Sequence, residues 1–317
     1  MWLRVLIGTV IALISAPMAL QSEEPAAGAG FRPVQRLVDL SGLAWLGGDT
    51  FLAVDDAKNP GENTRVRLSL LTVPRSPAGI LWKPLPALSG GQSSDLESAA
   101  RIPGTDAVLL VESGDDGSAF ERIFLAEVHP NRVNVVGAVD WSSFTDVFNV
   151  EATAVAETET GYIFIWAERN SGKQKTEINW TELRLDPFAI GPGVAWVELR
   201  LPEDLVNANG NPLYSRPVVA MDVDANGQIY TAAAFDPEGS VPDPDNGPFR
   251  SALFRIGQVI GDAIELDPEP SLLATLDGLK VESVAVREQD GQIELFVGSD
   301  DENYGGTLRR VPPPDVP

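Results

Sequence analysis

Acidic side chains are the residues of this sequence whose type and spacing could do chemistry. Glutamates recur at Glu97, Glu151 and Glu282, each at the start of a short apolar run. Further acids follow the next apolar run, among them Asp55–Asp56 and Asp300–Asp301. Carboxylates that converge raise each other's pKa, and a bound cation relieves their repulsion. Oxygen ligands without imidazole or thiolate favour Ca²⁺, or Mg²⁺, over zinc. The alternative is a solvated acidic rim.

The composition removes most other catalytic groups. The 317 residues include no Cys and a single His, which excludes a thiolate nucleophile, a disulfide framework and a zinc site built from several histidines. The 46 Asp+Glu against 23 Lys+Arg give a formal net charge of −23. Such a charge argues against nucleic acid and anionic membrane surfaces as partners. The sequence also contains no Gly-x-Ser-x-Gly elbow and no phosphate-binding Gly-rich loop.

Two further features resemble functional motifs but fit a structural role better. The segment Asp222–Gly227 opens like a calcium loop, but the twelfth position is Ala233, where a bidentate Glu is needed. Its Asn-Gly pair is typical of a type I′ hairpin turn. His129 lies in a turn between two expected outer strands, so we expect it on the face away from the acids. A Ser–His–Asp triad built on it is therefore not expected.

Five sequence repeats must position the acids. After residue 31, short runs rich in Val, Ile, Leu, Phe and Trp alternate with Gly, Pro, Asn and Asp, which indicates an all-β fold. Five units recur at intervals of about 60 residues, and each contains a small-residue strand, a turn and a strongly apolar strand that ends in acids. One column of the repeat contains Ser41, Glu97, Glu151, Val219 and Glu282. Such a unit fits one four-stranded blade of a β-propeller.

We therefore predict a single β-propeller over residues 31–312, with five four-stranded blades favoured. The fifth unit ends after three strands, at Thr307–Val311, so we expect Phe31–Val38 to close the ring as the outer strand of the last blade. Six blades stay open if a divergent blade lies within Trp180–Pro217. A β-sandwich with accidental internal similarity is the other alternative.

Propeller geometry places the acids at one end of the central channel. Inner strands line the channel, so the glutamates that begin them should meet at its mouth. The acids that end second strands should surround the same mouth. These are Asp55, Asp56, Glu112, Asp115, Asp116, Glu168, Asp236, Asp300, Asp301 and Glu302.

The N-terminus predicts export from the cytoplasm. Residues 1–22 read as a signal peptide, with Arg4, the apolar run Val5–Ile14 and small residues thereafter. The run is shorter than the roughly 20 residues of a membrane span, although an uncleaved anchor is the alternative. We expect residues 23–30 to be a flexible lead-in and residues 313–317 a tail. We expect a periplasmic or secreted monomer with no membrane span after cleavage.

The repeats are similar to those of secreted bacterial propellers in the phytase-like, "esterase-like activity of phytase" group. The resemblance rests on SGLAW…FLAVDD from Ser41, VEATAVAE…IFIWAERN from Val150 and VESVAV…LFVGSDDENYGG from Val281, and it covers nearly the whole mature chain. In that group a repeat begins Glu-Gly-Leu-Ala and ends Ser-Asp-Asp-Asn. Matched residue by residue, the resemblance implies that the recurring Glu is Glu97, Glu151 and Glu282, and that the terminal acids are Asp55–Asp56 and Asp300–Asp301. This chain departs from the pattern at Ser98, Ala152 and Ser283, where the group has Gly, and at Ser41 and Val219 in the Glu column.

Two hypotheses for function follow. The first is a calcium-dependent hydrolase of phosphate or carboxylic esters at the channel mouth, in which Arg169 holds the substrate anion. Its proposed metal ligands are Glu97, Glu151, Glu282, Asp55, Asp56, Asp300 and Asp301. The second is a non-enzymatic exported propeller that binds a small-molecule ligand or an extracytoplasmic protein. In that case the long insertions Val206–Arg216 and Pro237–Arg250 would shape the binding face.

Overall fold

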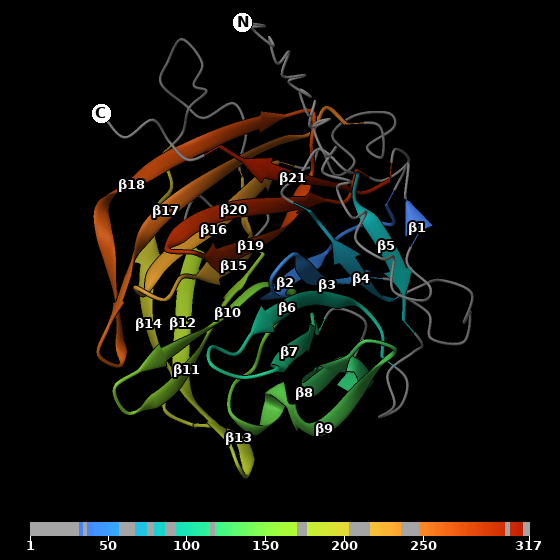
Figure 1. Ribbon diagram of the computed structural model, residues 1–317. Helices are drawn as coiled ribbons and strands as arrows, with labels where there is room; N and C mark the ends of the chain where they lie inside the picture. The colour runs from blue at the N-terminus through green and yellow to red at the C-terminus, as the bar shows by residue number, and fades with distance from the viewer. Residues whose placement is uncertain are drawn as a thin grey trace, which may run out of the picture.

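A computed structural model describes residues 32–33, 37–56, 67–74, 79–85, 93–114, 118–169, 176–202, 216–235, 247–301 and 305–312. The predicted signal peptide, lead-in and tail lie outside these ranges, as do Asp115, Asp116, Asp236 and Glu302. Within them the chain forms five antiparallel sheets. Figure 1 shows the sheets arranged around a common centre as the blades of a propeller. The predicted all-β fold with five blades is confirmed.

Each blade begins with an inner strand and continues outward in chain order. The first blade contains β2 (Gly42–Gly47), β3 (Thr50–Val54), β4 (Leu68–Thr72) and β5 (Leu81–Pro84). The second contains β6 (Leu96–Arg101), β7 (Ala107–Glu112), β8 (Arg122–His129) and β9 (Arg132–Asp140). The third contains β10 (Val150–Thr158), β11 (Gly161–Glu168) and β12 (Thr176–Leu185), with β13 (Phe188–Ile190) and β14 (Ala195–Leu199) both paired to β12. The fourth contains β15 (Val218–Val223), β16 (Gln228–Phe235), β17 (Arg250–Ile260) and β18 (Ala263–Asp277). The fifth contains β19 (Val281–Gln289), β20 (Gln292–Ser299) and β21 (Thr307–Val311).

Short 3₁₀ helices, η1 (Ser118–Phe120) and η2 (Trp141–Ser143), flank the outer strands of the second blade. The described part of Trp180–Pro217 completes the third blade. No helix among the described residues is long and apolar enough to cross a membrane.

The core lies between blades. The inner strands contact one another in the cyclic order β2, β6, β10, β15, β19 and back to β2. Five hydrophobic clusters each draw buried residues from two adjacent blades. Between the second and third blades, for example, the Trp141 ring lies 5.6 Å from the Trp166 ring. Because both faces of a blade meet a neighbour, the second strands read as continuous apolar runs, such as Val108–Val111 in β7.

The predicted closure of the ring by an N-terminal strand is not confirmed. β1 (Arg32–Pro33) pairs with β5 at the outer edge of the first blade, with Arg32 opposite Trp82. The last blade has three strands in the described part of the chain, and Leu37 meets it through an isolated bridge to Gly306. Proline lacks a backbone N–H, so a strand that contains one suits the edge of a sheet.

Side-chain packing joins the first and last blades. Leu43 and Phe51 of the first blade pack with Ala285 and Phe296 of the fifth. The rings of Phe51 and Phe296 lie 4.9 Å apart. The Leu40 amide also donates a hydrogen bond of 3.2 Å to the Ser299 carbonyl. The ring therefore closes through the same kind of interface that joins the other blades.

The segment Asp222–Gly227 forms the end of β15 and the turn into β16, as a hairpin predicts. The carboxylate of Asp224 accepts hydrogen bonds from the amides of Asn226 and Gln228, both at 2.9 Å. The turn is not the expected type I′, which requires positive φ at both central residues. Here Gly227 has a φ of 78°, whereas Asn226 does not adopt a positive φ.

Candidate functional site

The glutamate column is a row of β-bulges. In β6, Leu96 and Ser98 pair with consecutive residues of β7, which leaves Glu97 as the extra residue. The same irregularity isolates Glu151 in β10, Val219 in β15 and Glu282 in β19. A bulge leaves one residue unpaired and re-aims its side chain. The column found in the sequence is therefore a defined structural position at the start of the inner strands.

The residue after each column position is small, because the neighbouring blade lies close to the backbone there. A Cβ added to Gly42 would lie 2.7 Å from the Ala99 nitrogen, so this approach requires glycine. Where the sequence has serine, the hydroxyl bonds to the next blade. Thr153 Oγ1 donates to Ser98 Oγ at 2.8 Å, and Ser283 Oγ donates to the Leu40 carbonyl at 2.8 Å. At these two positions, where the Glu-Gly pattern has glycine, the serine hydroxyl therefore joins two blades by a hydrogen bond.

Three carboxylates form the tightest acidic group in the described part of the chain. Oxygens of Asp56, Asp95 and Glu97 all lie within 4.8 Å of one another. Asp95 stands two residues before Glu97 in the left-handed backbone region, with a φ of 55°. Its carboxylate accepts a hydrogen bond from Ser113 Oγ. We call Asp56, Asp95 and Glu97 the carboxylate trio.

The trio lies in an electrostatically unfavourable environment. Burial, together with the charges of Glu282, Asp55 and Asp95, raises the pKa of Asp56 to about 7, and the Lys280 charge acts to lower it. Burial also raises the pKa of Glu97 well above its usual range, with contributions from Asp56, Glu151 and Glu282. These contributions identify residues from the first, second, third and fifth blades as electrostatic neighbours. Of the predicted ligands, Asp55, Asp56, Glu97, Glu151 and Glu282 are therefore brought together.

The donor set of the trio fits a calcium ion. Ca²⁺ binds oxygen at about 2.3–2.6 Å, so two ligands on opposite sides of the ion lie about 5 Å apart. Oxygens within 4.8 Å of one another can therefore surround a single ion. The ligands are carboxylates, which suit a hard cation.

Two cations are paired with the other column glutamates, Glu151 and Glu282. Arg169 Nη1 lies 3.0 Å from Glu151 Oε1, and Lys280 Nζ lies 3.0 Å from Glu282 Oε1. Burial raises the pKa of Glu151 to about 7, although the Arg169 charge acts to lower it. Arg169 thus lies at the predicted site, but its guanidinium already contacts a protein carboxylate.

Other predicted mouth acids have structural partners. Asp301 accepts hydrogen bonds from the Lys280 amide at 2.8 Å and from Ser299 Oγ at 2.7 Å. Burial raises the pKa of Asp301, and these hydrogen bonds act to lower it. Asp300 is buried, and its amide donates to the Lys280 carbonyl at 2.9 Å. Neither acid is part of the carboxylate trio.

Glu112 is also paired within its own blade rather than with the trio. Arg122 donates two hydrogen bonds to its carboxylate, at 2.8 Å from Nε and 2.7 Å from Nη2. The amides of Ser94 and Arg122 add two more, both at 3.1 Å. The side chain of Glu112 is fully buried. Its role in the fold is therefore to join β7 to β8.

The sequence reasoning missed Asp95 and Lys280. Both stand two residues before a column glutamate, where Asn149 stands before Glu151. Each of these three residues begins its repeat unit, and that shared polar position is the signal that could have identified them.

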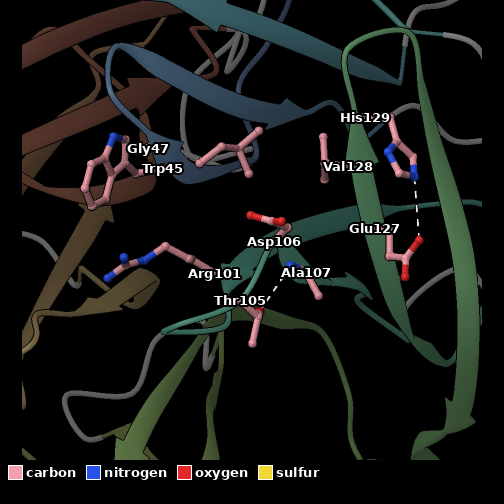
Figure 2. A pocket seen from close by; sticks show the side chains of 10 residues that line it. Trp45, Gly47, Arg101, Thr105, Asp106, Ala107, Glu127, Val128 and His129 are labelled. Atoms are coloured by element: carbon pink, nitrogen blue, oxygen red, sulfur yellow. Dashed lines mark hydrogen bonds and ion pairs between the residues drawn. The ribbon is translucent and has the colours of Figure 1, made fainter.

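A separate pocket opens on the opposite face, between turns of the first and second blades. Its volume is about 540 Å³, and Gly47, Thr105 and His129 are among its lining residues. Figure 2 shows Trp45 and Arg101 on one side, Asp106 near the middle, and Glu127 and His129 on the other side. His129 Nε2 lies 3.6 Å from a Glu127 oxygen. The turns that follow inner strands lie on this face, so His129 is remote from the trio.

Comparisons with known proteins support the fold. No protein-family model and no curated protein matches the chain. The α-L-arabinanase of Cellvibrio cellulosa, solved with arabinohexaose, has a TM-score of 0.51 at 12% identity, over 87% of this chain and 92% of that one. A thermostable family-43 glycoside hydrolase has a TM-score of 0.52 at 11% identity, over 90% of this chain and 91% of that one. At such identities the likeness establishes the propeller fold alone.

Proposed function

We propose that this chain is an exported hydrolase that cleaves esters at the channel mouth, with Ca²⁺ held by Asp56, Asp95 and Glu97. The observation that carries the proposal is the approach of three carboxylates, whose oxygens lie within 4.8 Å of one another. Grouped carboxylates that face further acids are costly to bury, and a divalent cation offsets that cost. The signal peptide expected at residues 1–22 and the similarity to phytase-like repeats agree with this proposal.

The chain's own residues would move the proton. A bound calcium ion would supply a Lewis acid that polarises the ester's acyl or phosphoryl oxygen. Glu151 would accept a proton from the attacking water as the new bond to oxygen forms, and return it to the departing alkoxide as the ester bond breaks. Arg169, 3.0 Å from Glu151, would hold that carboxylate in position.

The fold is compatible with this proposal but does not select its substrate. The two glycoside hydrolases named above have a similar fold, so this kind of propeller supports hydrolysis at least in those proteins. Because one fold hosts many activities, the ester substrate is argued from the site alone.

Hydrolysis of p-nitrophenyl acetate as a function of calcium concentration tests the proposal. We expect the rate to rise to saturation with Ca²⁺ and to fall to the buffer rate in EDTA. Glu97→Gln removes one ligand charge and should require at least about tenfold more Ca²⁺ for half-saturation. His129→Ala, on the opposite face, should stay within about threefold of the parent. A rate that does not depend on calcium would end the calcium role. No turnover of any ester would favour the non-enzymatic binding propeller.

A further inference from the structure

The pocket on the face opposite the mouth has the size of a ligand site. Its volume of about 540 Å³ lies within the roughly 300–1,000 Å³ that small-molecule sites occupy. It is lined by Trp45–Gly47 from the first blade and by Arg101, Thr105–Ala107 and Glu127–His129 from the second. We call it the opposite-face pocket. None of its lining residues belongs to the carboxylate trio, so a ligand here would be bound independently of the mouth.

Arg101 lines this pocket with a guanidinium that makes no hydrogen bond in the described part of the chain. The guanidinium carbon lies 5.0 Å from the centroid of the Trp45 ring, over its face. Its ion-pair partner is Glu288 at 3.7 Å, which is beyond hydrogen-bond distance. Glu288 itself accepts a hydrogen bond of 2.6 Å from the Ala225 amide. An arginine stacked on an aromatic ring holds its planar fork in one orientation, and that fork suits a carboxylate.

Carboxylates line the rest of the opposite-face pocket. Asp106 is exposed and has no hydrogen-bond or ion-pair partner among the described residues. Figure 2 shows its carboxylate near the middle of the pocket, with Arg101 to one side and Glu127 to the other. Glu127 lies 3.6 Å from His129. Arg101 and Asp106 do not pair with each other, so the pocket offers an arginine without hydrogen bonds and, at a separate place, a carboxylate without a partner.

These charges select the class of ligand. An anion would meet Asp106 and Glu127, and the formal net charge of −23 would repel it at longer range. An amine without an acidic group would leave the donors of Arg101 unused. A zwitterion can bind both groups and carries no net charge. Because the two groups are separate and the volume is about 540 Å³, a short peptide fits the pocket better than a single amino acid.

We infer that the opposite-face pocket binds a short peptide with free ends, its carboxylate on Arg101 and its ammonium on Asp106. Charge-assisted hydrogen bonds are about twice as strong as neutral ones, so both ends contribute to affinity. Leu46, Ala107 and Val128 provide apolar lining for the small side chains between the ends. The inference goes beyond the proposed hydrolase and does not depend on it.

Trialanine and two derivatives test the two ends separately. The C-terminal amide of trialanine lacks the carboxylate, and N-acetyl-trialanine lacks the ammonium. NMR titration of the isotope-labelled parent in EDTA follows the indole N–H of Trp45, which lines the pocket. We expect a Kd of about 1 mM or below for trialanine. Each derivative, and free alanine, should bind at least about tenfold more weakly. The same Kd for trialanine is expected in CaCl₂.

Substitutions at the two ends assign each contact. Asp106→Asn should weaken trialanine binding about tenfold and leave the Kd of N-acetyl-trialanine within about twofold. Arg101→Lys retains the charge but loses the planar fork, so it should weaken trialanine binding about fivefold and leave the amide within about twofold. Glu159→Gln is the matched control, because Glu159 is an exposed acid in the corresponding turn of the third blade. It should leave every Kd within about twofold.

Each contrary result overturns a stated part of the inference. Equal affinity for trialanine and either derivative overturns binding at both ends, and equal affinity for alanine overturns the peptide. If Arg101→Lys weakens all probes alike, the arginine is structural. A loss with Glu159→Gln as large as with Asp106→Asn would be an effect of net charge alone. A Kd that changes between EDTA and CaCl₂ overturns the independence from the mouth. No shift at Trp45 ends the inference and leaves the proposed hydrolase standing.

Discussion

Two buried glutamates of the second blade, Glu112 and Glu97, have opposite electrostatic surroundings. Glu112 at the end of β7 accepts two hydrogen bonds from Arg122 and two from backbone amides. Glu97 at the start of β6 lies near Asp56 and Asp95, and the Glu151 and Glu282 charges also raise its pKa. The first acid is satisfied by the protein. The second belongs to a group whose charge the protein leaves in excess, and the difference distinguishes an acid that supports the fold from one that is available to a ligand.

The largest change in the free energy of unfolding should come from breaking the ion pair between Glu112 and Arg122. Arg122→Met leaves the charge of Glu112 buried without its main partner, so the free energy of unfolding should fall by about 3–5 kcal/mol. The double variant Glu112→Gln/Arg122→Met removes both charges and should recover more than half of that loss. Urea unfolding of the parent and both variants measures these values.

An exposed pair provides the control for that experiment. Arg200 lies 3.0 Å from Glu198, and both side chains are exposed at the surface. Arg200→Met should therefore change the free energy of unfolding by about 0.5 kcal/mol or less. A similarly small loss for Arg122→Met would contradict the description of Glu112 as a buried acid held by its arginine.

Asp222 is a third buried acid, intermediate between Glu112 and Glu97 in how fully the protein satisfies its charge. Its carboxylate accepts hydrogen bonds from the amides of Val223 at 2.8 Å and Val286 at 2.7 Å. Burial nevertheless raises its pKa from 3.8 to about 6, although these amides and the charge of Arg101 lower it. Because the folded state holds this proton more tightly than the unfolded chain, its contribution to stability is present below pH 4 and is lost as pH rises through 6.

The measurement compares the pH dependence of the parent and Asp222→Asn. The free energy of unfolding of the parent, relative to the variant, should fall by up to about 3 kcal/mol between pH 4 and pH 7. Asp262→Asn should give the opposite sign, since the hydroxyls of Thr158 and Thr160 lower the pKa of that exposed acid. A flat difference for Asp222→Asn would show that backbone amides alone satisfy the buried charge.

The sequence predicted the positions of residues along the blades better than it predicted which side chains pair with one another. The repeat placed Glu97, Glu151 and Glu282 in one column because blade geometry repeats, and that column is a row of bulges. It could not separate Glu112 from the trio, because the pairing of Glu112 depends on Arg122 of the next strand.

Asp95 and the closure of the ring were also predicted incompletely, for physical reasons of the same kind. Asp95 joins the trio from the first position of its repeat unit, in a left-handed backbone conformation that Asn149 shares at the same position of the third unit. The expected N-terminal closure assumed that a missing fourth strand must be supplied. Packing of Phe51 against Phe296 joins those blades without it.

Thermal unfolding with and without calcium tests the central claim most directly. The parent is compared with Asp56→Asn/Asp95→Asn/Glu97→Gln in EDTA, in NaCl and in CaCl₂ of equal ionic strength. The control is Asp301→Asn, which removes a buried acid outside the trio. A ligand at about 100 times its Kd stabilises the folded state by about 2.7 kcal/mol, which raises Tm by several degrees. NaCl screens the repulsion without coordinating the carboxylates, so it should raise Tm less than calcium does.

We predict a calcium-specific rise in Tm for the parent and for Asp301→Asn, and its loss in the triple variant. An equal response of all three proteins to calcium would contradict the account, because the trio would then have no part in calcium binding.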